Sequence, residues 1–502
     1  MNYISTRSKL EKSLTSAEVI LKGIADDGGL FVPESIPKVT LDEIKSLIDL
    51  PYNKRAVAIL KRFLTDYTED ELNESAELAY DWFDVSSKVP FKILVNPNYK
   101  DSPVGVIELW HGNTSAFKDM ALQMLPQLMT RALKKVGETK EILILVATSG
   151  DTGKAALAGF ADVPQTKIMV FYPADGVSKI QKLQMVTQAG KNVNVTAVNG
   201  NFDDCQNGVK NIFADENIRA ELEKANVKLS SANSINWGRL VPQICYYFSA
   251  YADYVRNDAI KLGDVVNVAV PTGNFGNILA AYYAKRMGLP IKKLICASNV
   301  NHILTDFFNT GVYDRNRDFY KTITPSMDIL ISSNLERLLY HETNGDFKRV
   351  KTFMQELNTK GKYRIDAPLK KKLDKIFYAD YATEEETSNI IKEIYGNYKY
   401  LVDTHTAVAM QVIGKYRRNT KDMIPVMVAS TASPFKFTNA VLTALGESTE
   451  KIDDFAQLEK LSILTDNTVP KNLAILKNAK ILHENICDKD TMAEQVLKFA
   501  AR

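Results

Sequence analysis

Histidine and cysteine are scarce in this chain of 502 residues, which contains five histidines and four cysteines. The histidines do not occur in HExxH or HxH spacing, and the cysteines do not form a CxxC pair. Zinc sites are usually built from such closely spaced ligands, so the sequence predicts no structural or catalytic metal site. Dispersed cysteines are also typical of proteins in a reducing compartment, where thiols stay unpaired.

An excess of charge and long apolar runs are absent as well. The 63 Lys and Arg residues nearly balance the 60 Asp and Glu residues, giving a formal charge of +3 at pH 7. Near-balance gives no electrostatic reason to bind nucleic acid or a membrane surface. No apolar run is long enough to cross a bilayer, and Met1 does not begin a signal peptide. We therefore expect a cytoplasmic protein.

The composition that remains is that of an ordinary globular protein, with 45% hydrophobic and 25% charged residues. A chain of this length can form several domains. Leu41, Ile44, Leu47 and Ile48 follow helical spacing. Residues 1–95 are thus expected to form a mostly helical N-terminal unit that covers the rest.

After this unit, short apolar segments alternate with helical patterns. Many of the segments are continuous runs of Val, Ile and Leu, which indicates parallel strands covered on both faces. We predict an α/β catalytic core over residues 96–440 and a helical C-terminal extension over residues 441–502. Residues 301–400 give the weakest pattern. The expected strands are Leu94–Val95, Val104–Trp110, Ile142–Ala147, Ile168–Tyr172, Val193–Val198, Val265–Val270, Leu294–Ala297 and Pro425–Ala429.

The segment His111–Asp119 lies between the expected strand Val104–Trp110 and an expected helix, Met120–Lys134. Lys118 is then close to a helix N-terminus, where the helix dipole disfavours a cation by up to ~1 kcal/mol. A neutral or imine-bound lysine escapes this cost, so the position suggests a lysine that reacts with a carbonyl group. A surface lysine folded over the first turn explains this segment equally well.

Three strand-to-helix junctions combine small residues with hydroxyl groups: Ala147–Gly153, Pro271–Asn277 and Ser430–Lys436. Backbone amides at such turns form anion sites. The first junction lacks the glycine spacing of a P-loop, and the second is not GxGxxG, which disfavours nucleoside triphosphates and dinucleotides. Each junction alone could be a capped turn. Because ligands bind at the carboxyl ends of parallel strands, we expect all three junctions and Lys118 to line one crevice.

A fourth polar segment, Asn233–Arg239, precedes an expected helix over Leu240–Arg256. The arginine presents a planar fork of donors that matches an oxyanion. The segment therefore suggests a second anion site, with an asparagine-capped helix and an exposed arginine as the alternative.

Taken in order, these motifs resemble those of threonine synthases, pyridoxal-phosphate enzymes of fold type II, and specifically their longer microbial and fungal branch. The resemblance runs nearly end to end. Thr404 departs from it, since the related motif has proline there; we expect Asp403 and His405 to be structural. The matching segments are Tyr3–Arg7, Asp27–Pro33, His111–Asp119, Ser149–Gly153, Asn233–Arg239, Gly273–Asn277 and Asp403–Ala407.

The resemblance implies two open, twisted α/β domains with the cofactor between them, the smaller over about residues 125–250. It implies that Lys118 binds pyridoxal phosphate as a Schiff base and then acts as the main acid and base. Thr431 would contact the pyridine nitrogen. The cofactor phosphate would be held by Gly273, Asn274, Phe275, Gly276 and Asn277. The amino-acid end of the substrate would be held by Thr148, Ser149, Asp151 and Thr152, and its phosphate by Asn233, Ser234 and Arg239.

The activity implied is conversion of O-phospho-L-homoserine and water to L-threonine and phosphate, by a monomeric enzyme acting on a small molecule. Two alternatives stay open from sequence. A related phospho-lyase would release 2-oxobutyrate from the same site, since the cofactor motifs do not distinguish the two outcomes. A non-catalytic binding protein on this fold is disfavoured by the intact Lys118 and anion loops.

Overall fold

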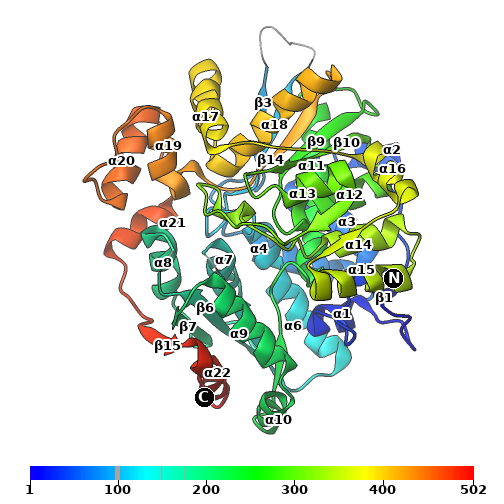
Figure 1. Cartoon of the computed structure of the whole chain (residues 1–502), viewed down its shortest axis with the longest axis vertical. Coiled ribbons are helices and arrows are strands. Elements are labelled where there is room, and N and C mark those ends of the chain that lie inside the picture. Colours follow the sequence, from blue (N-terminus) through cyan, green and yellow to red (C-terminus); the bar gives the residue numbers. More distant parts are fainter. Residues whose placement is uncertain (96–101, 149, 176) are drawn as a thin grey trace.

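Two sheets of mainly parallel strands form the two halves of the molecule (Figure 1). The computed structural model describes residues 1–95, 102–148, 150–175 and 177–502. Alternate residues of the strands pack to opposite faces: Val268 and Val270 join one hydrophobic core, whereas Ala269 between them joins a second. This two-sided burial is the reason for the continuous apolar runs and confirms the predicted α/β class.

The larger sheet has six strands in the order β13-β10-β9-β14-β4-β3. All neighbours are parallel except β3, which is antiparallel to β4. The junctions after β4, β9 and β14 consequently meet at one sheet edge. The strands are β3 (Phe91–Leu94), β4 (Val104–Glu108), β9 (Val266–Pro271), β10 (Ile291–Ser298), β13 (Phe377–Tyr381) and β14 (Val426–Ser430).

The smaller sheet has five parallel strands in the order β15-β7-β6-β5-β8. Its edge strand β15 comes from the C-terminal extension, which was predicted to be helical. Because Cys487 of β15 and Val496 of the last helix join the core of this sheet, the chain end belongs structurally to the smaller half. The strands are β5 (Glu141–Ala147), β6 (Thr166–Pro173), β7 (Val193–Asn199), β8 (Val227–Ser230) and β15 (Asn485–Asp488).

In the N-terminal segment, β1 (Tyr3–Ser5) pairs with β2 (Phe31–Pro33); one helix lies between these strands and three follow them. Three of the four helices begin with a capping box in which a threonine and a glutamate three residues later exchange hydrogen bonds. Buried Arg55 donates to Asp253 at 2.8 Å, and Arg7 forms a two-point ion pair with Glu336. The helices are α1 (Ser16–Lys22), α2 (Leu41–Ser46), α3 (Tyr52–Phe63) and α4 (Glu69–Tyr80).

The prediction of a single helix over Met120–Lys134 is wrong. The segment forms two helices, α5 (Asp119–Leu122) and α6 (Met124–Val136), which are separated at Gln123. Pro126 has no N–H to donate to the carbonyl of Leu122, so the hydrogen-bond ladder is interrupted. That carbonyl faces Gly159, where a Cβ atom would lie 2.0 Å away. The glycine thus allows the helix that carries it to approach closely.

The remaining helices cover the two sheets. The helix α11 is twenty residues long and mostly buried between the N-terminal helices and the larger sheet, whereas α18 covers the opposite face of that sheet. Every helix among the described residues is too short or too polar to span a bilayer. These helices are α7 (Asp151–Phe160), α8 (Lys179–Val186), α9 (Phe202–Ala214), α10 (Glu216–Lys224), α11 (Trp237–Arg256), α12 (Gly276–Met287), α13 (Ile303–Thr310), α14 (Leu335–Glu342), α15 (Phe347–Lys360), α16 (Ala367–Ile376), α17 (Glu384–Tyr398), α18 (Thr404–Thr420), α19 (Thr438–Ala444), α20 (Asp454–Thr465), α21 (Lys471–Ala474) and α22 (Met492–Ala500).

Candidate active site

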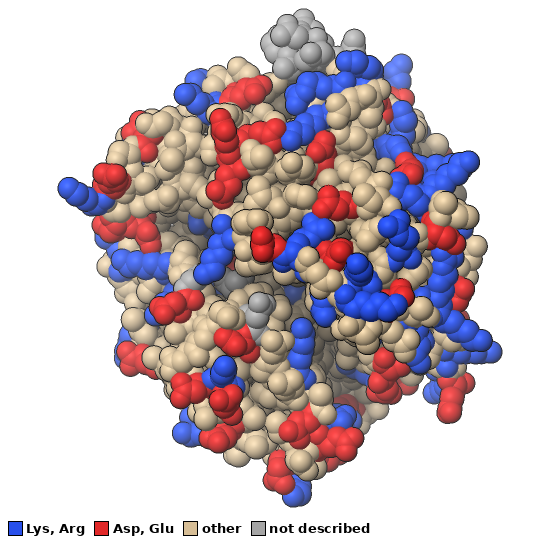
Figure 2. Space-filling view, in the orientation of Figure 1, with Lys and Arg blue, Asp and Glu red and all other residues tan. Residues whose placement is uncertain are grey.

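A cavity of about 2600 Å³ lies between the two halves. Figure 2 shows this face of the molecule hollowed near its middle. All the described residues that the sequence singled out as site residues line this one cavity, whereas Ser149 lies outside the described residues. The cavity therefore brings together segments from both sheets, as expected for ligands bound at strand ends.

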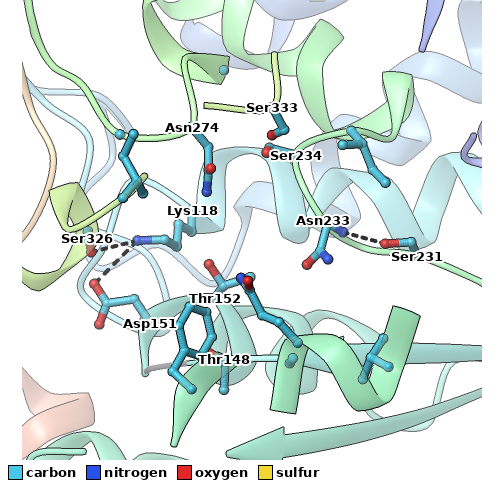
Figure 3. A pocket seen from close by; sticks show the side chains of 18 of the residues that line it. Lys118, Thr148, Asp151, Thr152, Ser231, Asn233, Ser234, Asn274, Ser326 and Ser333 are labelled. Atoms are coloured by element: carbon cyan, nitrogen blue, oxygen red, sulfur yellow. Dashed lines mark hydrogen bonds and ion pairs between the residues drawn. The ribbon is translucent and has the colours of Figure 1, made fainter. Parts of the chain in front are cut away.

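Lys118 lies on the loop that joins β4 to α5. Asp119 fixes this loop by accepting hydrogen bonds from the backbone and hydroxyl of Thr114, at 2.8 and 2.9 Å. The Nζ atom of Lys118 lies 3.2 Å from Oγ of Ser326 and 3.6 Å from Oδ2 of Asp151 (Figure 3). Its side chain is only 9% exposed. The amine thus points into the cavity from a rigid loop.

The pKa of Lys118 is lowered to about 8, mainly by burial; Lys436 and Arg239 also lower it, and Asp151 opposes them. A substantial fraction of the amine is therefore neutral near physiological pH, which is the form that attacks a carbonyl group. The sequence suggested the helix dipole as the cause, but α5 is a single turn, and burial is the largest cause of the shift.

Asp151 is the anionic partner of two buried lysines. Burial alone would raise its pKa, but Lys436 and Lys118 outweigh burial, and the pKa of Asp151 is lowered. Lys436 lies 2.6 Å from Oδ1 of Asp151 and donates to the carbonyl of Thr114 at 2.9 Å. The sequence identified Lys436 only as the end of a junction. The one signal for its burial in the sequence is that Lys436 directly follows the apolar pair Pro434 and Phe435.

Thr148 shapes the first junction. Its hydroxyl accepts hydrogen bonds from the backbone of Gly150 and Gly153, at 2.9 and 3.0 Å. Thr148 therefore holds the turn, while Thr152, one residue into α7, presents its side chain to the cavity (Figure 3).

The second junction joins β9 to α12 and forms the cradle for an anion. Phe275 adopts the left-handed conformation with φ of 63°, and Gly276 begins the helix. A Cβ atom at Gly276 would be in ordinary van der Waals contact, 3.6 Å from Nδ2 of Asn334 and from Cβ of Ser234. The start of α12 has no side-chain cap. Among the described residues, the buried Nδ2 atom of Asn277 has no hydrogen-bond partner. Free amides at a helix start and an unpaired amide donor fit a phosphate group.

Thr431 of the third junction lines the same cavity directly after β14. Its carbonyl accepts a hydrogen bond of 2.8 Å from the backbone of Phe117, which ties it to the Lys118 loop. Ser430 beside it accepts from Nε1 of Trp110 at 3.1 Å. The loops after β14 and β4 are therefore held together behind the lysine.

Arg239 lies in the first turn of α11 with only 6% of its surface exposed. Its guanidinium donates to the carbonyl of Ala232 at 2.8 Å, and burial lowers its pKa to about 10. Asn236 is the N-cap of α11 and is structural, whereas Asn233 and Ser234 line the cavity (Figure 3). Arg239 contributes positive charge that suits an oxyanion.

Besides Lys436, the cavity contains Ser326 and His405, which were not predicted as site residues. Ser326 lies in the segment for which the sequence pattern was weakest, on a short 3-10 turn at Pro325–Met327. His405 was expected to be structural; it is buried, but it also lines the cavity. Isolated polar residues in irregular loops give no periodic pattern, so Ser326 had no signal in the sequence.

Comparisons with known proteins agree with this geometry. Family models match residues 2–80 (Threonine synthase N terminus), 108–428 (Pyridoxal-phosphate dependent enzyme) and 406–479 (Threonine synthase, C-terminal). Threonine synthase from Pseudomonas aeruginosa is 38% identical over 447 residues, covering 88% of this chain and 90% of the relative. The Saccharomyces cerevisiae threonine synthase is 36% identical, and the match covers 95% of this chain and 96% of that relative.

Human Threonine synthase-like 1 is 41% identical over 86% of this chain, which spans only 58% of that relative's length. Among solved structures, the pyridoxal-phosphate-bound threonine synthase from Brucella melitensis has a TM-score of 0.87 at 34% identity, covering all of both chains. The yeast threonine synthase has a TM-score of 0.88 at 34% identity, covering 99% of this chain and 98% of that one.

Proposed function

Because the chain belongs to the threonine synthase family of pyridoxal-phosphate-dependent enzymes, we propose that it converts O-phospho-L-homoserine and water to L-threonine and phosphate. One observation carries the proposal: the buried amine of Lys118 shares a cavity with two separate anion-binding segments. A reaction on a phosphorylated amino acid, with a phosphorylated cofactor, needs both segments.

The residues present fit pyridoxal phosphate. Lys118 would hold it covalently, the start of α12 with Gly273–Asn277 would hold its phosphate, and Thr431 would contact its ring nitrogen. The fit is supported by the uncapped first turn of α12 and by the unpaired Nδ2 atom of Asn277. When bound, the cofactor supplies an electron sink for charge that develops on the substrate.

Lys118 supplies the base. Its lowered pKa allows the amine to accept a proton from a substrate carbon near neutral pH and to return it later. The carboxylate of Asp151 and the hydroxyl of Ser326 lie close enough to hold the amine between these transfers.

The second anion segment would hold the substrate phosphate through Asn233, Ser234 and Arg239. Among the buried ionic groups around Lys118, Lys436 and Arg239 are positive and Asp151 is negative. This positive balance would stabilise the negative charge that accumulates on the departing phosphate. Thr148, Ser149, Asp151 and Thr152 would then surround the amino-acid end, at the start of α7.

A second outcome has one specific observation in its favour. Relatives named threonine synthase-like are as similar to the chain as those named threonine synthase. We therefore keep a phospho-lyase that releases 2-oxobutyrate from O-phospho-L-homoserine as the alternative. The two outcomes differ in whether water is added at Cβ of the substrate.

We further propose a monomer that works in the cytoplasm and acts on a small molecule. Four buried, unpaired cysteines support a reducing location. As a working division we retain an N-terminal unit over residues 1–95, a catalytic core over 96–440 with a substrate sub-domain at about 125–250, and an extension over 441–502.

Product identification tests the proposed function. The purified protein, loaded with pyridoxal phosphate, is mixed with O-phospho-L-homoserine, and the carbon products are identified by NMR. We expect L-threonine and phosphate, and no turnover by Lys118→Ala under the same conditions. Formation of 2-oxobutyrate would replace the synthase with the lyase, and unchanged turnover by Lys118→Ala would reject this cavity as the active site.

A further inference from the structure

Ser326 contacts the reactive atom of the site, although it belongs to none of the motifs described above. Its Oγ atom lies 3.2 Å from Nζ of Lys118, on the side of the cavity opposite Asn233 (Figure 3). The carbonyl of Ser326 packs closely against the loop Gly273–Asn277: a Cβ atom at Gly273 would lie 2.5 Å from the carbonyl oxygen. Ser326 thus lies between the lysine and the loop that would hold the cofactor phosphate.

A histidine and an aspartate fix the backbone of Ser326. Its N–H donates to Nε2 of His405 at 3.2 Å, and Nδ1 of His405 lies 3.0 Å from Oδ1 of Asp403. Because Nε2 accepts a hydrogen bond, the proton of neutral His405 is on Nδ1 and is donated to Asp403. Asp403 is fully buried and caps the start of α18. The pair is therefore anchored in a helix of the larger half.

The rest of the turn is held as firmly. Asn299 donates to Oγ1 of Thr324 at 2.8 Å and to Oδ1 of Asp328 at 2.7 Å, and Asn301 donates to the same carboxylate at 2.9 Å. These bonds tie both sides of Ser326 to the segment that follows β10. Its hydroxyl therefore occupies a defined position rather than one of many in a loose loop.

A hydroxyl has a property that the other partner of Lys118 lacks. A carboxylate only accepts hydrogen bonds, so Asp151 favours the charged amine. A hydroxyl accepts from an ammonium group and also donates to the lone pair of a neutral amine. Ser326 can therefore hold the amine in both protonation states, which is what a lysine that repeatedly takes and returns protons requires.

We propose that Ser326 is a catalytic residue that holds the amine of Lys118 during proton transfer, and that His405, fixed by Asp403, is the residue that positions it. This proposal rests on the proposed function only in assuming that Lys118 is the base at a bound cofactor. It assigns a role to the Asp403–His405 pair beyond capping α18.

Exchange of a substrate proton tests the proposal without requiring a complete reaction. The holoenzyme is incubated in D₂O with L-2-aminobutyrate, which lacks the phosphate, and loss of the Cα proton is followed by NMR. We expect Ser326→Ala to slow exchange by roughly 10- to 100-fold, within the range by which a well-placed proton-transfer group accelerates a reaction. Ser326→Thr retains the hydroxyl and should stay within about 5-fold of wild type. Ser462→Ala, which changes a serine on α20 that does not line the cavity, is the matched control.

The positioning role of His405 has its own variants. The amide oxygen of His405→Gln can still accept the N–H of Ser326, whereas His405→Leu cannot. We expect exchange to be slow in His405→Leu and largely restored in His405→Gln. A purely structural role would instead lower thermal stability while leaving the exchange rate per loaded site at the wild-type value. That result, or wild-type exchange by Ser326→Ala, would overturn the proposal.

A second readout needs no turnover. In cofactor-free protein, the pH midpoint for capture of pyridoxal phosphate reports the protonation of Lys118. Because the hydroxyl can hold both forms of the amine, its loss should slow capture in Ser326→Ala, but not in Ser326→Thr, while the pH midpoint stays near that of wild type. A shifted midpoint in Ser326→Ala would show that the hydroxyl favours one protonation state and would contradict the proposal. If wild type exchanges the Cα proton but makes no threonine, the proposed function fails while the test of Ser326 remains valid; a wild type that neither exchanges the proton nor makes threonine would reject both.

Discussion

The Nζ atom of Lys118 lies 3.6 Å from Oδ2 of Asp151, whose other oxygen lies 2.6 Å from Nζ of Lys436. One carboxylate therefore balances two buried ammonium groups. Because a cation and an anion at short range change each other's pKa, the protonation of the reactive amine depends on both neighbours. This arrangement determines the pH range in which Lys118 can react.

Removing the carboxylate should make Lys118 easier to deprotonate. The pKa of Lys118 is about 8 in wild type, and Asp151 raises it. Capture of pyridoxal phosphate by the cofactor-free enzyme requires the neutral amine, so the capture rate should rise through a midpoint near pH 8. In Asp151→Asn the midpoint should lie at lower pH. Stopped-flow absorbance against pH measures the shift, and a midpoint at higher pH would contradict the assigned coupling.

Removing the second lysine should have the opposite effect. Lys436 lowers the pKa of Lys118, and its loss also leaves Asp151 to pair with Lys118 alone. The capture midpoint of Lys436→Met should therefore lie above that of wild type. Near-ultraviolet circular dichroism checks that both variants are folded. Shifts of the same sign in Asp151→Asn and Lys436→Met would show that the amine does not sense these two charges.

Arg239→Ala should weaken binding of phosphorylated substrates selectively. A hydrogen bond to a charged group contributes about 1.5–3 kcal/mol, which corresponds to a roughly 10- to 150-fold rise in KM for O-phospho-L-homoserine. Binding of L-2-aminobutyrate should change much less. Arg349→Ala removes an arginine of α15 that pairs with Asp366, and it serves as the control. An equal loss of affinity for both ligands would remove Arg239 from the phosphate site.

Gly273→Ala should reduce affinity for the cofactor. A Cβ atom at this position would lie 2.5 Å from the carbonyl of Ser326, so the loop after β9 must shift. We expect at least a 10-fold rise in the dissociation constant of pyridoxal phosphate, measured by absorbance titration; this is about 1.4 kcal/mol. Gly396→Ala on α17 is the matched change, because its Cβ atom would meet nothing within 4 Å. Equal affinities in the two variants would contradict the predicted crowding.

His341 should make the protein less stable in acid. Burial lowers its pKa to about 3, helped by Arg286 and Arg337, and its Nε2 atom lies 2.7 Å from the hydroxyl of Tyr283. The unfolded chain takes up this proton near pH 6.5, whereas the folded protein does not. The contribution of His341 to the free energy of unfolding is therefore fully present above pH 6.5. It declines as the pH falls toward 3, by up to about 1.4 kcal/mol per pH unit.

In His341→Gln this contribution disappears. The melting temperature should therefore fall less steeply between pH 6.5 and 4 than in wild type, even if the variant is less stable at pH 7. Differential scanning calorimetry at several pH values measures both slopes. Parallel curves for the two proteins would show that His341 is not the group responsible.

The parts of the site that follow strands were predictable from the sequence. The apolar runs of β4, β9 and β14 indicated parallel strands, and parallel strands bring the segments at their ends to one edge. Lys118, Thr431 and Gly273–Asn277 were therefore expected together, and they line one cavity. The break between α5 and α6 was also within reach, since Pro126 cannot complete a continuous helix.

Contacts between distant irregular segments were not predictable. Ser326 contacts Lys118 from a turn that has no periodic pattern. The position of this turn depends on Asn299, which binds Asp328 in the turn, and on His405, and both lie in distant parts of the chain. Similarly, β15 completes a sheet whose other strands lie more than 250 residues earlier. Such pairings depend on three-dimensional packing, on which local propensity has no bearing.

The most direct test of the account is to find which lysine binds the cofactor. Burial also lowers the pKa of Lys154 to about 8, and Lys436 lies beside Asp151, so reactivity alone does not single out Lys118. Holoenzyme is treated with borohydride to make the bond to the lysine permanent, then digested and mapped by mass spectrometry. We predict the cofactor mass on the peptide that contains Lys118. The same mass on Lys154 or Lys436 would contradict the account.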